Sequence, residues 1–122
     1  PTLVGSITSN TTSALREESA RITCANAGSA VVQQTGSWIS SVSNVGTGSC
    51  TVNITAGIFS GTPICQTTVF NAVAATNWIF AQVTAASTSA ISLFRAFNAT
   101  AANGDIYITC TGTKCWNNFT VI

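Results

Sequence analysis

The stretch Cys50-Thr51-Val52-Asn53-Ile54-Thr55-Ala56 alternates apolar and polar residues without a break. A period of two is typical of a β-strand with one buried and one exposed face, because successive side chains point to opposite sides of a sheet. Turn-forming sequences flank the stretch, Gly46-Thr47-Gly48-Ser49 before it and Ser60-Gly61-Thr62-Pro63 after it. The stretch therefore predicts a strand between two turns.

The same period recurs along most of the chain. Turn-forming residues separate the alternating segments, and Asn103-Gly104, in the small-residue loop 98–104, is a typical pair for a tight turn. Strands at intervals of about 8–15 residues predict an all-β fold, a β-sandwich or jelly roll. The further predicted strands lie within residues 22–25, 31–32, 38–42, 64–70, 78–84, 91–97, 105–110 and 119–121.

One short helix is predicted in residues 12–20, because Thr12 or Ser13 suits an N-cap and two glutamates follow in the first turns. The segment is also rich in charge compared with the rest of the chain. Two interpretations of this charge stay open, a solvated turn or a ring of ion pairs between chains at a stem. Four of the seven charged residues lie in or beside the segment: Arg16, Glu17, Glu18 and Arg21.

Residues 22–94 contain no Asp, Glu, Lys, Arg or His. The polarity of the chain comes instead mainly from neutral side chains, with 20 Thr, 14 Ser and 10 Asn among its 122 residues. A net charge of +1 argues against nucleic-acid binding, which needs several cationic side chains to displace counterions. No apolar run approaches the ~18–20 residues of a membrane helix, so no membrane insertion is predicted. Because nearly neutral surfaces tend to associate, we expect an oligomer.

The length of 122 residues corresponds to a single domain. We expect residues 1–35 to form a stem segment that includes the first strand or strands, and residues 36–122 to form a β-sandwich tip. The chain begins at Pro1 without a signal-peptide pattern, so we expect it to be a piece of a longer protein.

Enzymatic activity is not predicted. A glycosidase needs two carboxylates on either side of the scissile bond, and the only acidic residues are Glu17, Glu18 and Asp105. The chain has no histidine to activate a Ser or Cys nucleophile. It also lacks the Cys-x-x-Cys spacing of a zinc site. We therefore predict neither a metal nor a cofactor.

The five cysteines allow two interpretations. They are small buried hydrophobes on strands, or they form one or two disulfides in an oxidising, extracytoplasmic compartment. Cys65 and Cys110 each end an alternating segment, so a cross-strand disulfide between them is the first prediction. A Cys110–Cys115 disulfide that closes a short loop is the second. The odd number leaves at least one thiol unpaired or paired with another chain.

Three blocks of sequence together resemble the C-terminal head domains of trimeric, phage-tail-fibre-like bacterial proteins, including the mosaic adhesive trimers of predatory bacteria. The resemblance covers residues 36–112. Such heads are often jelly rolls like those of tumour necrosis factor and the complement globular heads. The resemblance implies a homotrimer whose protomers bury apolar faces on a threefold axis, with a ligand recognised at the tip or between protomers. The blocks are Gly36-Ser37-Trp38-Ile39-Ser40-Ser41-Val42 with Gly46-x-Gly48, Thr51-Val52-Asn53-Ile54-Thr55-Ala56-Gly57-x-Phe59-Ser60-x-x-Pro63-x-Cys65, and Asp105-x-Tyr107-Ile108-x-Cys110-x-Gly112.

A sugar ligand requires neutral hydrogen-bonding groups and an aromatic ring on which its C–H face can stack. Trp38 is interpreted as a core residue, whereas Trp116 and Trp78 are better candidates for exposure, and Tyr107 is a further candidate aromatic. Arg95 and Asp105 flank the loop 98–104, so we expect them to pair with each other or to bracket a ligand. Arg95 requires some partner, because a buried unpaired guanidinium is costly. The candidate ligand-binding residues are Trp116, Trp78, Asn77, Arg95, Asp105 and Asn117.

The sequence therefore predicts a non-enzymatic adhesive or receptor-binding tip domain of a trimeric fibre. Its expected partners are two further copies of the chain and a glycan or another cell-surface polymer. Its expected location is extracytoplasmic, at a cell surface, secreted or exposed to a periplasm. Two alternatives stay open, a purely structural trimerisation or capping module of a fibre and a strand-exchanging, pilin-like subunit.

Overall fold

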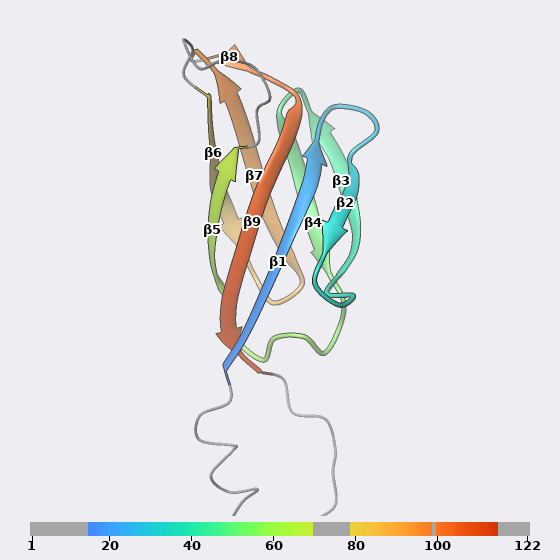
Figure 1. Ribbon diagram of the computed structural model, residues 1–122, viewed down its shortest axis with the longest axis vertical. Helices are drawn as coiled ribbons and strands as arrows, with labels where there is room; N and C mark the ends of the chain where they lie inside the picture. The colour runs from blue at the N-terminus through green and yellow to red at the C-terminus, as the bar shows by residue number, and fades with distance from the viewer. Residues whose placement is uncertain (1–14, 70–78, 99, 115–122) are drawn as a thin grey trace, which may run out of the picture.

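The computed structural model describes residues 15–69, 79–98 and 100–114, and this part of the chain contains nine β-strands and no helix. The strands form two antiparallel sheets that face each other (Figure 1). The predicted all-β sandwich is therefore confirmed. The strands are β1 (Leu15–Cys24), β2 (Ala30–Gln34), β3 (Ile39–Gly46), β4 (Ser49–Ile54), β5 (Ile64–Val69), β6 (Ile79–Ala86), β7 (Ala90–Phe97), β8 (Thr100–Ala101) and β9 (Gly104–Thr113).

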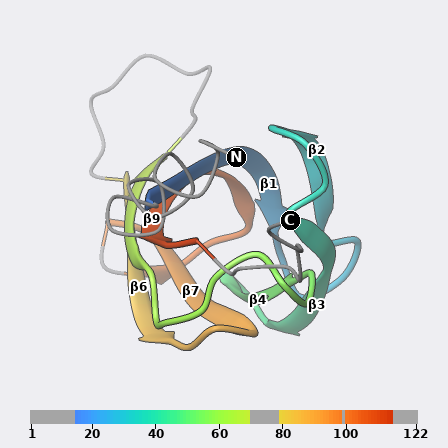
Figure 2. The ribbon, with the colours of Figure 1, turned by 90° about the horizontal axis from the view of Figure 1, so that it is seen from below.

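The first sheet has the strand order β2-β1-β9-β5, and the second has the order β3-β4-β7-β6, with β8 paired to β7. Figure 2 looks along the sandwich from the end at which β1 begins and shows the two sheets opposite each other. On one side, Thr67 of β5 donates its hydroxyl to the carbonyl of Ala81 on β6 at 2.9 Å. On the other, the Gln34 carboxamide accepts from the Ile39 N–H at 2.8 Å and donates to the Ile39 carbonyl at 3.2 Å. Side-chain hydrogen bonds thus connect the sheets along both sides.

The helix predicted in residues 12–20 is wrong for residues 15–20, which belong to β1; residues 12–14 lie outside the described part of the chain. β1 occupies an inner position of the first sheet, with β2 on one side and a ten-residue register with β9 on the other. Every second residue from Glu18 to Cys24 is buried, as a strand requires. Pairing with two neighbours therefore outweighs the local helix signals of this segment.

Three of the four charged residues of this segment form ion pairs within the chain. Arg16 and Glu18, two residues apart on one face of β1, are joined by an Nε–Oε2 contact of 2.5 Å. Arg21 is paired with Asp105 on β9 at 2.8 Å. The interpretation of the segment as a solvated turn is wrong, since Glu18 is only 9% exposed and belongs to an inner strand.

The core lies between the sheets and includes Trp38, which has no exposed surface, as predicted. The Trp38 Nε1–H donates to the carbonyl of Ser19 at 3.0 Å, so the one polar group of this ring is satisfied. The largest fully buried side chains are Trp38, Ile22, Ile91, Leu93, Ile106, Ile108, Val52, Cys24, Cys50 and Cys110.

Most predicted strands agree with the structure to within a few residues, but the predicted tight turn at Asn103-Gly104 is wrong. Gly104 begins β9, and neither residue has the positive φ that such a two-residue turn needs. The loop predicted in residues 98–104 instead contains β8. The last predicted strand, in residues 119–121, lies outside the described residues.

Two disulfides connect the strands. Cys65–Cys110 joins directly opposed residues of β5 and β9 and confirms the first predicted pairing. The alternative Cys110–Cys115 pairing is wrong, because Cys110 is bonded to Cys65; Cys115 lies outside the described residues. The second disulfide, Cys24–Cys50, joins β1 of the first sheet to β4 of the second. These four cysteines are therefore not free thiols, and the disulfides indicate an oxidising, extracytoplasmic environment.

The two ends of the sandwich differ in what they contain. Leu15 is paired with Thr113, so β1 begins and β9 ends at the same end, called the proximal end below. At the opposite, distal end, residues 25–29 connect β1 to β2, residues 47–48 connect β3 to β4, and residues 102–103 connect β8 to β9 (Figure 1). The distal end is therefore built from connections that are far apart in the sequence.

Candidate functional site

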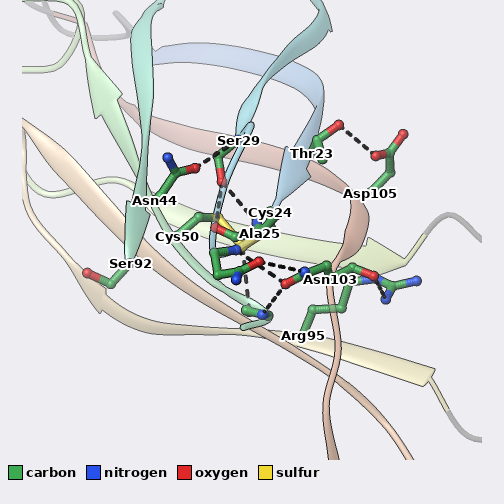
Figure 3. The surroundings of a disulfide bond; sticks show 12 residues. Thr23, Cys24, Ala25, Ser29, Asn44, Cys50, Ser92, Arg95, Asn103 and Asp105 are labelled. Atoms are coloured by element: carbon green, nitrogen blue, oxygen red, sulfur yellow. Dashed lines mark hydrogen bonds between the residues drawn. A yellow bond between two sulfur atoms is a disulfide. The ribbon is translucent and has the colours of Figure 1, made fainter. Parts of the chain in front are cut away.

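Asn103 connects three segments of the distal end (Figure 3). Its Oδ1 accepts hydrogen bonds from the backbone N–H of Gly48 at 2.8 Å and of Asn26 at 3.3 Å, and its Nδ2 donates to Asn26 Oδ1 at 2.8 Å. A carboxamide suits this position because it carries both donors and an acceptor without a charge. Asn103 thus holds the β8–β9 connection against the β1–β2 loop and the β3–β4 turn.

The β1–β2 loop is also held from the other side. Asn44 of β3 accepts a hydrogen bond from the Ser29 N–H at 2.8 Å, and the Ser29 hydroxyl accepts from the Ala25 N–H at 2.9 Å. The Cys24–Cys50 disulfide lies at the base of this loop (Figure 3). The distal connections are therefore ordered by neutral hydrogen bonds and one covalent link.

Gly48 is the point of closest backbone approach at the distal end. It has a φ of +70°, and a Cβ atom there would lie 2.8 Å from the backbone nitrogen of Ala102. The Gly48 carbonyl accepts from the Arg95 N–H at 2.7 Å. The β3–β4 turn can contact β7 and the β8–β9 connection this closely because glycine has no side chain.

Arg95 supports the distal end from inside. It is only 6% exposed, and its Nη1 donates to the carbonyls of Asn103 at 2.8 Å and Ala102 at 3.3 Å. A Cβ at Gly104 would lie 2.5 Å from this Nη1, so the guanidinium lies directly against the start of β9. The expectation that Arg95 has a partner is confirmed, and its partners are backbone carbonyls.

The burial of Arg95 has an electrostatic cost. Desolvation lowers the pKa of the guanidinium below its usual value, and the nearby negative charge of Asp105 opposes this only in part. The Arg95 Nε is buried and makes no hydrogen bond to any residue that the structure describes.

Asp105 faces outward from β9 rather than pairing with Arg95, so that predicted ion pair is wrong. Its Oδ2 accepts from Arg21 Nε and its Oδ1 from the Thr23 hydroxyl, both at 2.8 Å and both from β1. Arg95 points into the core from β7. The two predicted site residues therefore lie on different sides of the first sheet.

A groove of about 260 Å³ lies on the outer face of the first sheet, over β1, β2 and β9. It lies beside a β-bulge, where β2 has an extra residue, Val32, opposite the step from Arg21 to Ile22. A bulge bends and twists its strand, and this separates the edge of the sheet from its centre. The side chains that face this groove, called the Tyr107 groove below, come from Ser19, Arg21, Gln33, Thr35, Tyr107 and Thr109.

Tyr107 is the aromatic residue of this groove and is 42% exposed. It lies on the inner strand β9, directly opposite Arg21 on β1 and Thr68 on β5. The hydroxyls of Ser19 and Thr109, one row nearer the proximal end, are 3.2 Å apart and share a hydrogen bond. An aromatic ring is therefore surrounded by polar side chains on an exposed sheet face.

A second hollow, of about 460 Å³, lies on the same face nearer the proximal end. Leu15 and Ile64 line it together with Glu17 and have exposed fractions of 72% and 76%. The two aliphatic side chains give the proximal end an exposed apolar area.

The outer face of the second sheet carries neutral polar side chains together with an aromatic pair. The Asn53 carboxamide donates to the hydroxyls of Ser41 and Ser43, both at 2.9 Å. Phe80 is 43% exposed, and its ring centroid lies 6.4 Å from that of Phe94 on β7. This face thus carries an exposed aromatic residue that already has an aromatic neighbour.

Four predicted ligand-binding residues, Asn77, Trp78, Trp116 and Asn117, lie outside the described residues. Sequence analysis missed Arg21 and Gln33 as site residues. The alternation in β1 could have placed Arg21 outward, but the predicted helix obscured it. Gln33 carries no local signal, because only the pairing of β2 with β1 places it opposite Arg21.

No protein family, no curated protein sequence and no solved structure matches this chain. Residues 15–69, 79–98 and 100–114 contain no group of three or more His, Cys, Asp or Glu side chains that could bind a metal ion. In the same part of the chain there is no apolar helix of the length that a bilayer crossing requires.

Proposed function

We propose that this chain is the non-enzymatic adhesive tip domain of a homotrimeric, extracytoplasmic fibre, and that it binds glycans or another neutral cell-surface polymer. The observation that carries this proposal is the braced distal end, which lies opposite the end at which β1 begins and β9 ends. Asn103 and the Cys24–Cys50 disulfide order its connections before any ligand arrives. A surface that is already ordered loses less conformational entropy on binding.

The strand pairing supports a jelly roll as the finer description of the fold. β1 pairs with β9, and β4 pairs with β7, so an outer and an inner pair of strands are nested. Nested antiparallel pairs of this kind occur in jelly rolls, whereas the consecutive pairs β1–β2, β3–β4 and β6–β7 each stay within one sheet, so the nesting is the part of the topology that supports a jelly roll.

The surface composition supports both the oligomer and the type of ligand. Leu15 and Ile64 at the proximal end are apolar enough to favour burial against further copies of the chain. The hydroxyl and carboxamide groups on both outer faces suit a ligand rich in neutral hydroxyls better than a charged polymer. The two disulfides fit a location at a cell surface or in a secreted assembly.

The test combines a solution mass with a glycan screen. Light scattering after gel filtration, at low micromolar concentration, should give three times the chain mass of 12.5 kDa. The protein, displayed as this oligomer, is then applied to an array of neutral and acidic glycans and should bind a subset of the neutral ones. A monomer would contradict the trimeric tip, and an open-ended series of larger species would favour the strand-exchanging subunit. A trimer with no signal above blank would favour the structural capping module.

A further inference from the structure

We propose that the Tyr107 groove is a binding site for one neutral hexose unit of a glycan. The site rests on the proposed glycan-binding function and assigns it to the outer face of the first sheet. In this site the Tyr107 ring stacks on the C–H face of the sugar, and the polar side chains around it bind the sugar hydroxyls.

The position of Tyr107 is the first reason. Its neighbours on the sheet face are Arg21 across β1 and Thr68 across β5, with Asp105 and Thr109 two residues away along β9. A ring that is 42% exposed in this setting provides an apolar surface next to hydrogen-bonding groups, which is the combination that a sugar requires.

The polar groups are the second reason. The Gln33 carboxamide is exposed and makes no hydrogen bond within the part of the chain that the structure describes. A carboxamide can donate and accept at once, so it can bind two neighbouring sugar hydroxyls. Arg21 is held in place by its Nε hydrogen bond to Asp105, and Asp105 is in turn held by the Thr23 hydroxyl. These groups are therefore positioned before the ligand binds.

The charge of the groove selects a neutral sugar. The guanidinium of Arg21 and the carboxylate of Asp105 neutralise each other at 2.8 Å, and the other side chains facing the groove are uncharged. An acidic sugar would meet Asp105 close to the positive charge of Arg21 and gain little net attraction. The volume of about 260 Å³ lies just below the roughly 300–1,000 Å³ of pockets for drug-sized ligands, and this fits a single sugar unit.

The test measures the affinity of the best neutral glycan from the array for the oligomer and for four variants by titration calorimetry. Tyr107→Ala should lower the affinity at least about tenfold, whereas Tyr107→Phe, which keeps the ring, should stay within about threefold. Gln33→Ala should lower it about two- to tenfold, the range that one neutral hydrogen bond provides. Phe80→Ala is the matched control and should leave the affinity unchanged, because Phe80 has nearly the same exposure as Tyr107 but lies on the outer face of the second sheet.

The results separate this site from the proposed function. Glycan binding that survives Tyr107→Ala, or that Phe80→Ala weakens equally, would overturn the site while leaving the tip function intact. Preference for sialylated over neutral glycans would also overturn it. A change of solution mass in Tyr107→Ala, with the thermal midpoint retained, would assign this face to contacts between copies and refute the site. No glycan binding by the unaltered oligomer would refute the function and the site together.

Discussion

Replacing Gly48 by alanine should destabilise the fold far more than the same replacement at Gly28, although both glycines have a left-handed backbone, with φ of +70° and +74°. At Gly28 a Cβ would meet no atom within 4 Å. At Gly48 it would overlap the backbone of Arg95 and lie 2.8 Å from the Ala102 nitrogen. Since backbone atoms of paired strands cannot move aside individually, the β3–β4 turn itself has to shift.

The magnitudes follow from these two settings. A left-handed conformation costs an alanine about 1–2 kcal/mol, and alanine recovers roughly 0.4–1 kcal/mol by reducing the freedom of the unfolded chain. Gly28→Ala should therefore lower the free energy of unfolding by about 1 kcal/mol. Gly48→Ala has the same backbone cost of about 1 kcal/mol and in addition loses two hydrogen bonds. These bonds run from the Arg95 N–H to the Gly48 carbonyl and from the Gly48 N–H to Asn103 Oδ1. At about 1 kcal/mol each, and more where a buried group is left unpaired, the total reaches about 3–4 kcal/mol.

Both free energies can be measured by guanidinium denaturation followed by tryptophan fluorescence, with the disulfides intact. The expected outcome is a difference of about 2–3 kcal/mol between the two variants at unchanged slope. Equal losses would mean that the distal connections do not contact each other as closely as described, and the account of the braced distal end would fail. A changed slope would instead indicate that the variant alters the compactness of one of the two states.

Three further predictions concern the stability of the same fold. Replacing Cys24 and Cys50 together by alanine opens a link that spans 26 residues and should cost about 3.5 kcal/mol by the loop-entropy relation, measured by the same denaturation. Asn103→Ala removes three hydrogen bonds that join separate connections and should cost about 2–3 kcal/mol. Asn53→Ala removes two hydrogen bonds to exposed serine hydroxyls, which water can replace, and should cost less than about 1 kcal/mol, so similar losses would contradict a bracing role for Asn103. Trp38→Phe should cost about 2–3 kcal/mol through lost volume and the lost Nε1 hydrogen bond, and a thermal midpoint equal to that of the unaltered chain would refute its central place in the core.

Local sequence patterns were sufficient to predict strands in which apolar and polar residues alternate with a period of two. The alternation around Cys50, Ile64, Ile91 and Ile106 predicted β4, β5, β7 and β9 nearly to their bounds, because a half-buried strand shows its two faces in every pair of residues. The Cys65–Cys110 disulfide was predictable because each of these cysteines ends an alternating segment, which suggests that they lie on neighbouring strands.

Local patterns failed where two signals competed. In β1 the alternating burial from Glu18 to Cys24 coexists with N-cap and glutamate signals that favour a helix. Only the pairing with β2 and β9 decides between them, and that pairing involves residues about 90 positions away, such as Thr109 opposite Ser19. The prediction of a tight turn at Asn103-Gly104 was wrong for a similar reason. The local pair favours a turn, but the Asn103 carboxamide accepts hydrogen bonds from the backbone of Gly48 and Asn26, which are distant in the sequence.

The amino-acid sequence by itself determined that this chain is an all-β sandwich with Trp38 in its core and almost no charge on its surface, because period-two alternation and composition are local properties. The tertiary structure alone decided that Cys24 meets Cys50, that Asp105 binds Arg21 rather than Arg95, and that Tyr107 and Gln33 face one groove. Each of these depends on which strands become neighbours. That choice is made by the burial of whole sheet faces against each other, and no short stretch of the chain contains it.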